Sequence, residues 1–433
     1  MKVEIEVTTK EIIKPSSPTP THLRYYQLSF MDQTQPPVYN SCIFFYSKSD
    51  GDIIAKSNKL KQSLSKVLTS YYPLAGRIED KVSVDCNDEG AYYQEAQAKC
   101  QLSHITVDSN PKELKKLLPC EPDNATHYVL LAIQVNFFTC GGTAIGACIS
   151  HKLADGLSTI MFIKTLASVA RGESNSICPQ ITSSTLFPPK STFSVSQPKS
   201  DMTKEKLVLK RFVFSSASIA ALKAKYAEES SSALENRLYP SRVEALTALI
   251  YSRYIAATQV KLGAKKLHIV FHAVNLRTRM DPPLPQPEHS FGNISWPTSA
   301  ILSSETGQAL SQGLVGKLRA AIGKVNNDFV KTLQEDNDPA NRVREIAGKF
   351  RGEDIVIFIF SSLCRFPLYV IGFGWGKPIW VAWVNSPPFT NTAFFLDTKC
   401  GDGIEAWLTL KDEDMAKFEC DDEIRILGYL SIT

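Results

Sequence analysis

The sequence predicts an α/β protein in which strands and helices are mixed along the chain. Apolar and polar residues alternate, as in a strand, at 1–7, 82–86 and 207–214. Between such segments lie runs with helical spacing of apolar residues, as at 60–70. No internal repeat with the period of a solenoid or propeller is present. This mixture favours an α/β class with mixed α+β sheets.

Length and composition indicate a globular protein with a sizeable core. The chain has 433 residues, which suggests about two to three domains, and 43% of the residues are hydrophobic against 21% charged. Lysine and arginine number 48 against 44 acidic residues, a net charge of only +4. No basic block interleaved with aromatic residues is present, so nucleic acid is not an expected partner. A local basic patch is still enough for a small phosphorylated ligand.

The sequence also predicts a soluble, cytoplasmic protein without disulfides or metal. The N-terminal stretch has no continuous apolar run of the signal-peptide kind, and the apolar segments 129–135 and 355–360 fall short of the roughly 20 residues of a membrane helix. Ten cysteines are scattered singly, without a C-x-x-C pair or a Cys/His cluster at metal spacing. They indicate reduced thiols, so the N-x-[ST] sequons at Asn124 and Asn293 are interpreted as chance.

The first part of the chain runs from an extended entry into helix and strand. The proline-rich stretch 14–20 cannot form a helix or a central strand, so we expect it to lie extended on the surface. The spacing at 60–70 predicts a helix that ends before Pro73. Alternation at 82–86, followed by the turn residues 87–90, predicts a strand and a turn.

The clearest boundary lies at 187–205, where prolines, serines and lysines replace apolar periodicity. Beyond it the patterns predict a strand at 207–214, a helix at 218–226 and a strand at 267–274. Ser241 and Glu244 form an S-x-x-E capping box that opens a further helix to Ala257. A second linker is expected at about 335–341, and strands return at 394–397 and 403–410.

The most informative stretch places a histidine between a strand and a helix. A glycine-rich apolar strand at 140–150 is followed by His151, then by Asp155 and a helix from near Leu157. A histidine at such a junction is rigidly held and can face a cleft, as a general base requires. Asp155 can hold the turn or a distant arginine without titrating itself. The alternative, a histidine with a purely structural role, is less consistent with the full H-x-x-x-D-G context.

Two other clusters admit both a functional and a structural interpretation. Three glycines alternate with aromatics at 370–378, which indicates a close backbone crossing or a ligand site but does not match a dinucleotide or phosphate loop. Arg277 and Arg279 follow the strand 267–274, where they can pair a buried carboxylate, meet a phosphate or stay solvated. The G-x-S-x-G, G-x-x-x-x-G-K-[ST] and H-E-x-x-H motifs are absent.

Together these residues resemble the BAHD family of plant acyl-CoA-dependent acyltransferases. The family's H-x-x-x-D signature reads His151 to Asp155 here, and its D-F-G-W-G signature reads Gly372, Phe373, Gly374, Trp375 and Gly376. Further segments that fit the family are 17–20, 72–77, 83–90, 140–146, 187–189, 275–284 and 397–407. The resemblance covers the whole chain, and it is greatest with the branch of alkaloid O-acetyltransferases.

The resemblance implies two chloramphenicol-acetyltransferase-like domains with a solvent channel between them. The N-terminal domain would comprise 1–186 and about 374–398, and the C-terminal domain 206–373 and about 399–433. A long crossover loop at 187–205 would join them. Acyl-CoA would enter the channel from one face and the alcohol from the other, with His151 at the midpoint.

The resemblance also implies a reaction. His151 would take the proton of the acceptor hydroxyl as this attacks the thioester, and would then protonate the departing CoA thiolate. The indole N–H of Trp375 or a nearby hydroxyl would stabilise the oxyanion. The acceptor would be a small-molecule alcohol, with an alkaloid favoured, and the donor would be acetyl-CoA. The enzyme would be a monomer that binds no resident cofactor, metal, nucleic acid or membrane.

One departure from the family pattern is Gly372, which stands where the signature has aspartate. The family's carboxylate is structural and pairs with an arginine, so we expect Arg277 or Arg279 to lack one partner and to bond Asp155 or water instead. A loosened loop is the expected result. The departure also motivates an alternative, a catalytically weak relative that binds a small molecule or a partner protein. Intact His151 and Asp155 argue against it.

Overall fold

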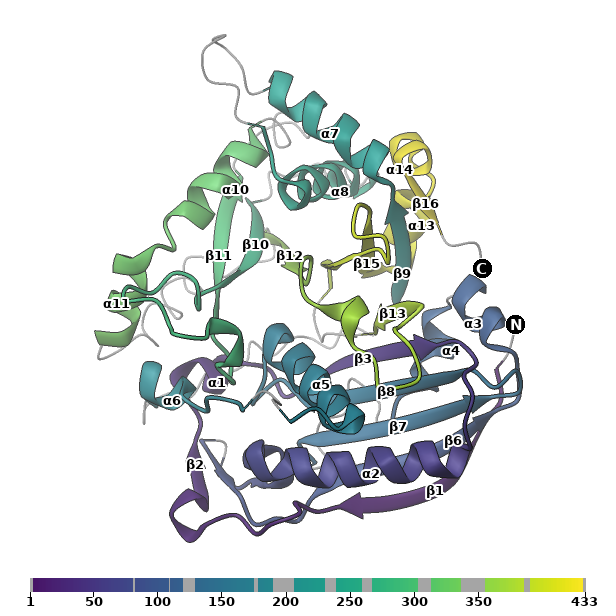
Figure 1. Cartoon of the computed structure of the whole chain (residues 1–433). Helices are drawn as coiled ribbons and strands as arrows, with labels where there is room; N and C mark the ends of the chain where they lie inside the picture. Colours follow the sequence, from purple (N-terminus) through teal and green to yellow (C-terminus); the bar gives the residue numbers. More distant parts are fainter. Residues whose placement is uncertain are drawn as a thin grey trace.

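Two large mixed sheets form the framework of the molecule (Figure 1). The computed structural model describes residues 3–80, 82–108, 110–119, 129–174, 178–189, 206–229, 239–258, 267–302, 313–335, 355–384 and 390–430. Figure 1 shows the first sheet in the lower part of the view and the second sheet above it, with α7 (Ser216–Glu229) and α8 (Arg242–Thr258) at the top. The predicted fold class is confirmed.

The first sheet has strand order β1-β6-β7-β8-β3-β13. Its strands are β1 (Ile5–Ile13), β3 (Tyr39–Tyr46), β6 (Ala91–Ala98), β7 (Leu131–Phe138), β8 (Thr143–Ser150) and β13 (Trp380–Trp383). A small sheet beside it has the order β2-β5-β4 and consists of β2 (Tyr25–Gln27), β4 (Arg77–Ile78) and β5 (Ser83–Asp85). Only β6 and β7 pair in parallel in the first sheet.

The second sheet has strand order β11-β10-β12-β14-β15-β9-β16. Its strands are β9 (Leu207–Phe214), β10 (Leu267–Asn275), β11 (Ser295–Leu302), β12 (Ile355–Ser362), β14 (Thr392–Asp397), β15 (Ile404–Lys411) and β16 (Gly428–Leu430). Strands β10, β12 and β14 run parallel to one another, so their carboxyl ends lie at one edge.

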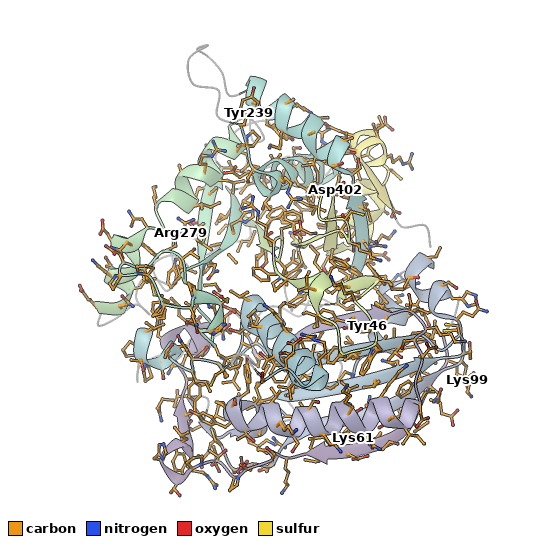
Figure 2. All side chains as sticks on the ribbon, viewed as in Figure 1. Tyr46, Lys61, Lys99, Tyr239, Arg279 and Asp402 are labelled. Carbon is orange, nitrogen blue, oxygen red and sulfur yellow. The ribbon has the colours of Figure 1, made fainter. Side chains whose placement is uncertain are left out.

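Helices cover both sheets, and we call the part of the molecule built on the first sheet the first half and the part built on the second sheet the second half. The remaining helices are α1 (Phe30–Thr34), α2 (Ile53–Ser70), α3 (Leu102–Asp108), α4 (Pro111–Lys115), α5 (Gly156–Arg171), α6 (Ser183–Leu186), α10 (Leu314–Gly323), α11 (Asn327–Glu335), α13 (Asp412–Phe418) and α14 (Asp422–Leu427). Figure 2 shows Lys61 and Lys99 on the outside of the first half, whereas Tyr46 lies inside and is fully buried. Within the described residues, no helix is long and apolar enough to cross a membrane.

Local sequence signals explain where the main helices begin. Helix α2 begins earlier than the predicted residue 60, because the Asp52 carboxylate accepts a hydrogen bond from the backbone N–H of Ala55 and so caps the first turn. The predicted capping box of α8 is present: Ser241 Oγ accepts from the Glu244 N–H at 3.1 Å, and the Glu244 carboxylate accepts from the Ser241 N–H at 2.7 Å.

The return of the chain to the first sheet is shorter than the expected segment 374–398. Strand β13 joins the first sheet, but β14 pairs with β12 and β15 of the second. The reason is the tight turn between Asp397 and Ile404, which makes β14 and β15 a hairpin and therefore keeps both strands in one sheet. Of the expected linkers, 190–205 and 336–341 lie outside the described residues.

A buried polar cluster joins the two sheets near β13. The Arg211 guanidinium makes two hydrogen bonds of 2.8 Å to the Glu405 carboxylate, and the Trp380 indole N–H donates to the same carboxylate at 3.2 Å. Trp380 belongs to the first sheet and the ion pair to the second. Because Glu405 is only 2% exposed, its charge depends on these partners.

We expect Glu405→Ala to lower the free energy of unfolding by roughly 3–5 kcal/mol, because it leaves the Arg211 charge buried without its carboxylate. Chemical denaturation of the purified protein measures this loss. The control is Asp412→Ala, which removes an exposed pair with Lys206 and should cost less than about 1 kcal/mol. Equal losses in the two variants would contradict the conclusion that the buried pair of Arg211 and Glu405 stabilises the fold.

Candidate active site

His151 lies at the junction between β8 and α5, held by backbone on both sides. Its N–H donates to the carbonyl of Val38 at 2.8 Å, which fixes the residue directly after the last rung of the β3 and β8 ladder. The side chain is half-buried. A rigid backbone with a partly accessible ring is the arrangement that a general base requires.

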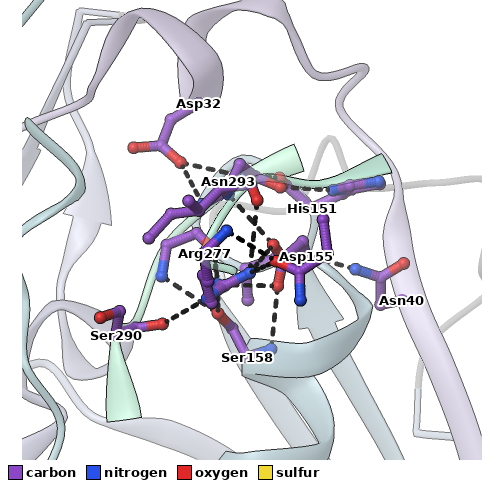
Figure 3. Close-up of polar contacts among 12 residues, drawn as sticks. Asp32, Asn40, His151, Asp155, Ser158, Arg277, Ser290 and Asn293 are labelled. Atoms are coloured by element: carbon purple, nitrogen blue, oxygen red, sulfur yellow. Dashed lines mark hydrogen bonds and ion pairs between the residues drawn. The ribbon is translucent and has the colours of Figure 1, made fainter. Parts of the chain in front are cut away.

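The ring of His151 has a defined tautomer because of Asn293. The Asn293 amide donates from Nδ2 to the Asp32 carboxylate at 2.8 Å and to the His151 carbonyl at 2.8 Å, so its Oδ1 is the acceptor that faces the ring. His151 Nδ1 lies 3.1 Å from this Oδ1 and must therefore carry the proton (Figure 3). In the neutral ring, Nε2 is then the basic nitrogen. No other residue in the described part of the chain hydrogen-bonds to Nε2.

Burial lowers the pKa of His151 below its ordinary value, because the charged ring loses solvation. The carbonyl of His151 itself, the negative charge of Asp155 and the hydrogen bond to Asn293 oppose this shift without reversing it. The ring is consequently neutral at physiological pH, and a neutral ring can accept a proton.

Asp155 does not contact the imidazole. Its carboxylate bonds the first turn of α5 and two residues of the second half, Arg277 and Ile294. Its Oδ1 accepts the Ser158 N–H at 2.9 Å, which caps α5. Its Oδ2 accepts the Ile294 N–H at 3.0 Å and Arg277 Nη1 at 2.7 Å, and Oδ1 also accepts Arg277 Nη2 at 3.2 Å. Burial alone would raise the pKa of Asp155, but Arg277 and these N–H donors hold it below its ordinary value.

Arg277 is buried to 1% exposure and its donors are all used. Besides Asp155, the guanidinium bonds the carbonyls of Ser290 at 3.1 Å and Gly292 at 3.1 Å, and Ser158 Oγ at 2.9 Å. The Asn275 carboxamide accepts another bond at 3.3 Å. The expected bond between Arg277 and Asp155 is therefore present, and the guanidinium has no donor without a partner.

The segment Ser290–Ile294 of the second half is inserted into the first half. The Asp32 carboxylate at the start of α1 accepts the Asn293 N–H at 3.0 Å in addition to the Asn293 amide. Gly292 has φ +134, and a side chain there would meet Ser183 at 2.4 Å, so only glycine fits this close approach. The position of His151 in the first half is thus set by a residue of the second.

Asn293 bonds the His151 ring and Asp32 bonds Asn293, but the sequence analysis singles out neither residue for the site. From the sequence, Asn293 is interpreted only as part of a chance N-x-[ST] sequon. The sequence does carry a local signal for Asp32, because Ser29 and Asp32 have the spacing of a helix capping box. The structure contains that box at the start of α1. The long-range bond between Asp32 and Asn293, however, follows from the tertiary fold alone.

The Gly372 to Gly376 loop lies at the other end of α5. Arg171, the last residue of α5, donates from Nη1 to the Gly372 carbonyl, whereas Asp155 caps the first turn. The sixteen residues of α5 span about 24 Å. Along β3, Asn40 bonds the Ala154 carbonyl and Tyr46 bonds the Ile371 carbonyl, which again separates the two places by about 20 Å.

This separation corrects three expectations from the sequence. Trp375 stacks on Phe373 at a centroid distance of 5.6 Å and does not reach His151, so it cannot serve as the oxyanion donor. Arg279 donates to the Val325 carbonyl at 3.1 Å, away from both Asp155 and Gly372. The arginine beside Gly372 is Arg171.

Glu173 supplies the carboxylate that Gly372 lacks. Arg171 pairs with Glu173 through Nε at 2.6 Å and Nη2 at 2.8 Å, and Ser168 Oγ donates to the same carboxylate at 2.6 Å. The Arg171 and Ser168 bonds lower the pKa of Glu173 to about 2. The arginine is therefore paired although the signature aspartate is missing.

Comparisons with known proteins agree with this architecture. A family model described as the Transferase family matches residues 3–424. The chain is 37% identical to limonoid 7-O-acetyltransferase from Citrus sinensis over 99% of both chains, and 38% identical to vinorine synthase from Rauvolfia serpentina over 96% of both. The crystal structure of vinorine synthase superposes with a TM-score of 0.81 at 34% identity, covering 98% of each chain. TRI101 of F. sporotrichioides shares the fold at 18% identity, with a TM-score of 0.75 over 94% of this chain and 99% of that one.

A two-sheet fold with a histidine at the junction, matched over its length by acetyltransferases, defines an acyltransferase. The chain belongs to the BAHD family of acyltransferases and is an acyl-CoA-dependent O-acyltransferase.

We expect Asp155→Ala to lose stability together with rate, because the substitution leaves the Arg277 charge buried and removes the cap of α5. The cost should be roughly 3–5 kcal/mol of unfolding free energy. Thermal unfolding and turnover of the same preparation measure both effects, with Asp397→Ala as a control for loss of a less buried arginine pair. An inactive variant that melts like the wild type would assign Asp155 a direct chemical role instead.

Gly372→Asp, which restores the family signature, should lower the melting temperature. A Cβ at this position would lie 2.7 Å from the Gly376 carbonyl oxygen, and overpacking of this kind typically costs 1–3 kcal/mol. The control is Gly372→Ala, which has the same contact without the charge and should lose about as much. A rise in melting temperature for the aspartate variant would show that a new pair with Arg171 outweighs the crowding.

Proposed function

We propose that the enzyme transfers an acetyl group from acetyl-CoA to a hydroxyl of a plant specialised metabolite, with His151 as the general base. The proposal rests mainly on one observation: Asn293 holds the proton on Nδ1 of His151, which leaves Nε2 as a basic nitrogen on a neutral ring. Relatives named as acetyltransferases of limonoids, stemmadenine and salutaridinol support the acetyl donor. Both a limonoid and an alkaloid are therefore candidate acceptors.

The proposed reaction needs one base and one leaving group. Nε2 takes the hydroxyl proton as the acceptor oxygen attacks the thioester carbonyl, so a C–O bond forms and the carbonyl becomes an oxyanion. Collapse of this intermediate breaks the C–S bond, and the protonated histidine returns its proton to the CoA thiolate. The products are the acetate ester and free CoA, and the histidine is regenerated.

The proposal also covers the substrate channel, the oligomeric state and the cellular compartment of the enzyme. A solvent channel between the halves would bring acyl-CoA and alcohol to His151 from opposite faces. The enzyme would act as a monomer in the cytoplasm, in keeping with its scattered cysteines. The alternative, a catalytically weak binding protein, is motivated by Gly372; the pairing of Arg171 with Glu173, about 20 Å from His151, supports the acyltransferase instead.

The test of the proposal is release of free thiol from acetyl-CoA in the presence of limonoid and alkaloid alcohols. A donor series from acetyl to benzoyl follows for any alcohol that reacts. A protein that binds alcohols but releases no thiol with any donor would instead support the binding-protein alternative.

His151→Ala should reduce kcat by about 10²–10⁴-fold, because it removes the base. Its melting temperature should stay near that of the wild type, since the ring is half-buried and contributes little to the core. The control is His104→Ala, an exposed histidine on α3, which should keep full activity. A His151→Ala variant that kept a third of the wild-type kcat would disprove the assignment.

A further inference from the structure

One side of the second sheet carries apolar side chains that lie outside the hydrophobic clusters found among the described residues. Side chains of a strand alternate between two faces, and on β10, β11 and β12 one face packs under the helices α7, α8 and α10. The other face carries Ile269, Phe271, Ile301, Ile357 and Ile359, which we call the open face. None of these five residues packs in the hydrophobic clusters found among the described residues.

Register places the open-face residues in two rows across the sheet. Ile301, Ile269 and Ile357 stand directly opposite one another, and Ser299, Phe271 and Ile359 form the adjacent row. Ile301 is 48% exposed and Ile357 39% exposed, Phe271 and Ile359 are half-buried, and Ile269, between Ile301 and Ile357, is fully buried. Apolar side chains that gather on one strand face and are partly exposed are a candidate binding surface.

The open face continues into the active site. Strand β11 begins directly after Asn293 and Ile294, which bond His151 and Asp155. Strand β10 ends at Asn275, which accepts bonds from Arg277. Ser295 and Ser299 are four residues apart, so the row of Phe271 lies about 13 Å along the strand from this end.

Strands β14 and β15, next to the open face in the same sheet, show which part of the molecule the open face is turned toward. On β14 and β15, Leu396 and Trp407 point to the same side and pack in the core of the first half. The open face therefore continues a surface that faces the first half, beside the residues that join the two halves. Figure 1 shows α7, α8 and α10 on the outside of this sheet. A small molecule held between the halves is the occupant that fits this placement.

The open face is apolar, and this restricts the class of ligand that it can bind. Within the described strands β10, β11, β12 and β14, no position on this side carries a charged residue. The backbone N–H groups belong to the sheet ladders. The phosphates of CoA need cations or free N–H donors, so this surface does not suit them. A protonated amine would lack a counter-charge, and an unpaired buried charge is costly. Farther along the sheet, the Glu405 carboxylate is already bound by Arg211 and Trp380.

We propose that the open face binds the hydrocarbon skeleton of the acceptor, and that the acceptor is a rigid, uncharged polycyclic alcohol rather than a protonated amine. This inference rests on the proposed function and narrows its acceptor class. Phe271 and Ile359, the two members nearest the active site, are the specificity-determining residues.

The first experiment measures equilibrium binding with a matched pair of ligands. Androstan-3β-ol and its 17β-amino derivative share one fused-ring skeleton and differ by one positive charge at neutral pH. Binding to the wild-type protein, followed by intrinsic tryptophan fluorescence, should be at least tenfold tighter for the neutral member. Equal affinities, tighter binding of the amine, or binding of neither would overturn the proposal.

The second experiment alters the open face. Phe271→Ala should weaken binding of the neutral member at least fivefold, while Val356→Ala, on the helix-packed side of β12, should leave it unchanged. Ile359→Asp should improve binding of the amine at least fivefold relative to Ile359→Asn, which has the same shape without the charge. If Ile359→Asp fails to fold, the Phe271 variant and the ligand pair still test whether the open face binds the neutral acceptor.

Steady-state kinetics separate this inference from the proposed function. With any alcohol that turns over, Phe271→Ala should raise KM for the acceptor and leave KM for acetyl-CoA unchanged. A rise in KM for acetyl-CoA alone would assign the open face to the donor and overturn the inference. Selective binding of the neutral ligand without thiol release would overturn the proposed reaction but support the ligand class.

Discussion

The buried pair of Asp155 and Arg277 is the interaction on which the site depends. Asp155 caps the helix that follows His151, and Arg277 belongs to the second half of the chain. Because both charges are buried, they favour one relative position of the two halves, in which every donor of the guanidinium is satisfied. That position brings Ser290–Ile294 against α1, and only then can Asn293 reach the histidine ring. The aspartate of the H-x-x-x-D motif thus holds the two halves and the turn after His151 in position.

The arrangement around His151 and the departure from the signature at Gly372 are independent of each other for a geometric reason. The neutral ring of His151 is held at the first turn of α5, and the loop with Gly372 is anchored at its last residue by Arg171. A rigid helix separates the two places, and Glu173 supplies a carboxylate at the second one. Loss of one signature residue therefore leaves the arrangement around His151 unchanged.

Sequence patterns predicted the elements better than their partners. The capping box at Ser241 and the strand at 207–214 were predicted correctly, because their signals are local. The expected return of 374–398 to the N-terminal domain extends too far, because β14 pairs with β12 and β15, and the apolar pattern of a strand does not determine which strands it pairs with. His151 and Asp155 were found from their spacing. Asn293, Asp32 and the arginine next to Gly372 were not, since each acts through a contact more than 100 residues away in sequence.

The most direct test of this account is the protonation state of the His151 ring. Nitrogen NMR of histidine-labelled protein, with His151→Ala to assign the signals, reports which ring nitrogen carries the proton and where the ring titrates. The account predicts a proton on Nδ1, a bare Nε2 and a pKa below the ordinary value. Asn293→Ala should remove the preference for this tautomer. A proton on Nε2, or a ring still charged at neutral pH, would contradict the central claim that Asn293 and Asp32 prepare His151 as the base.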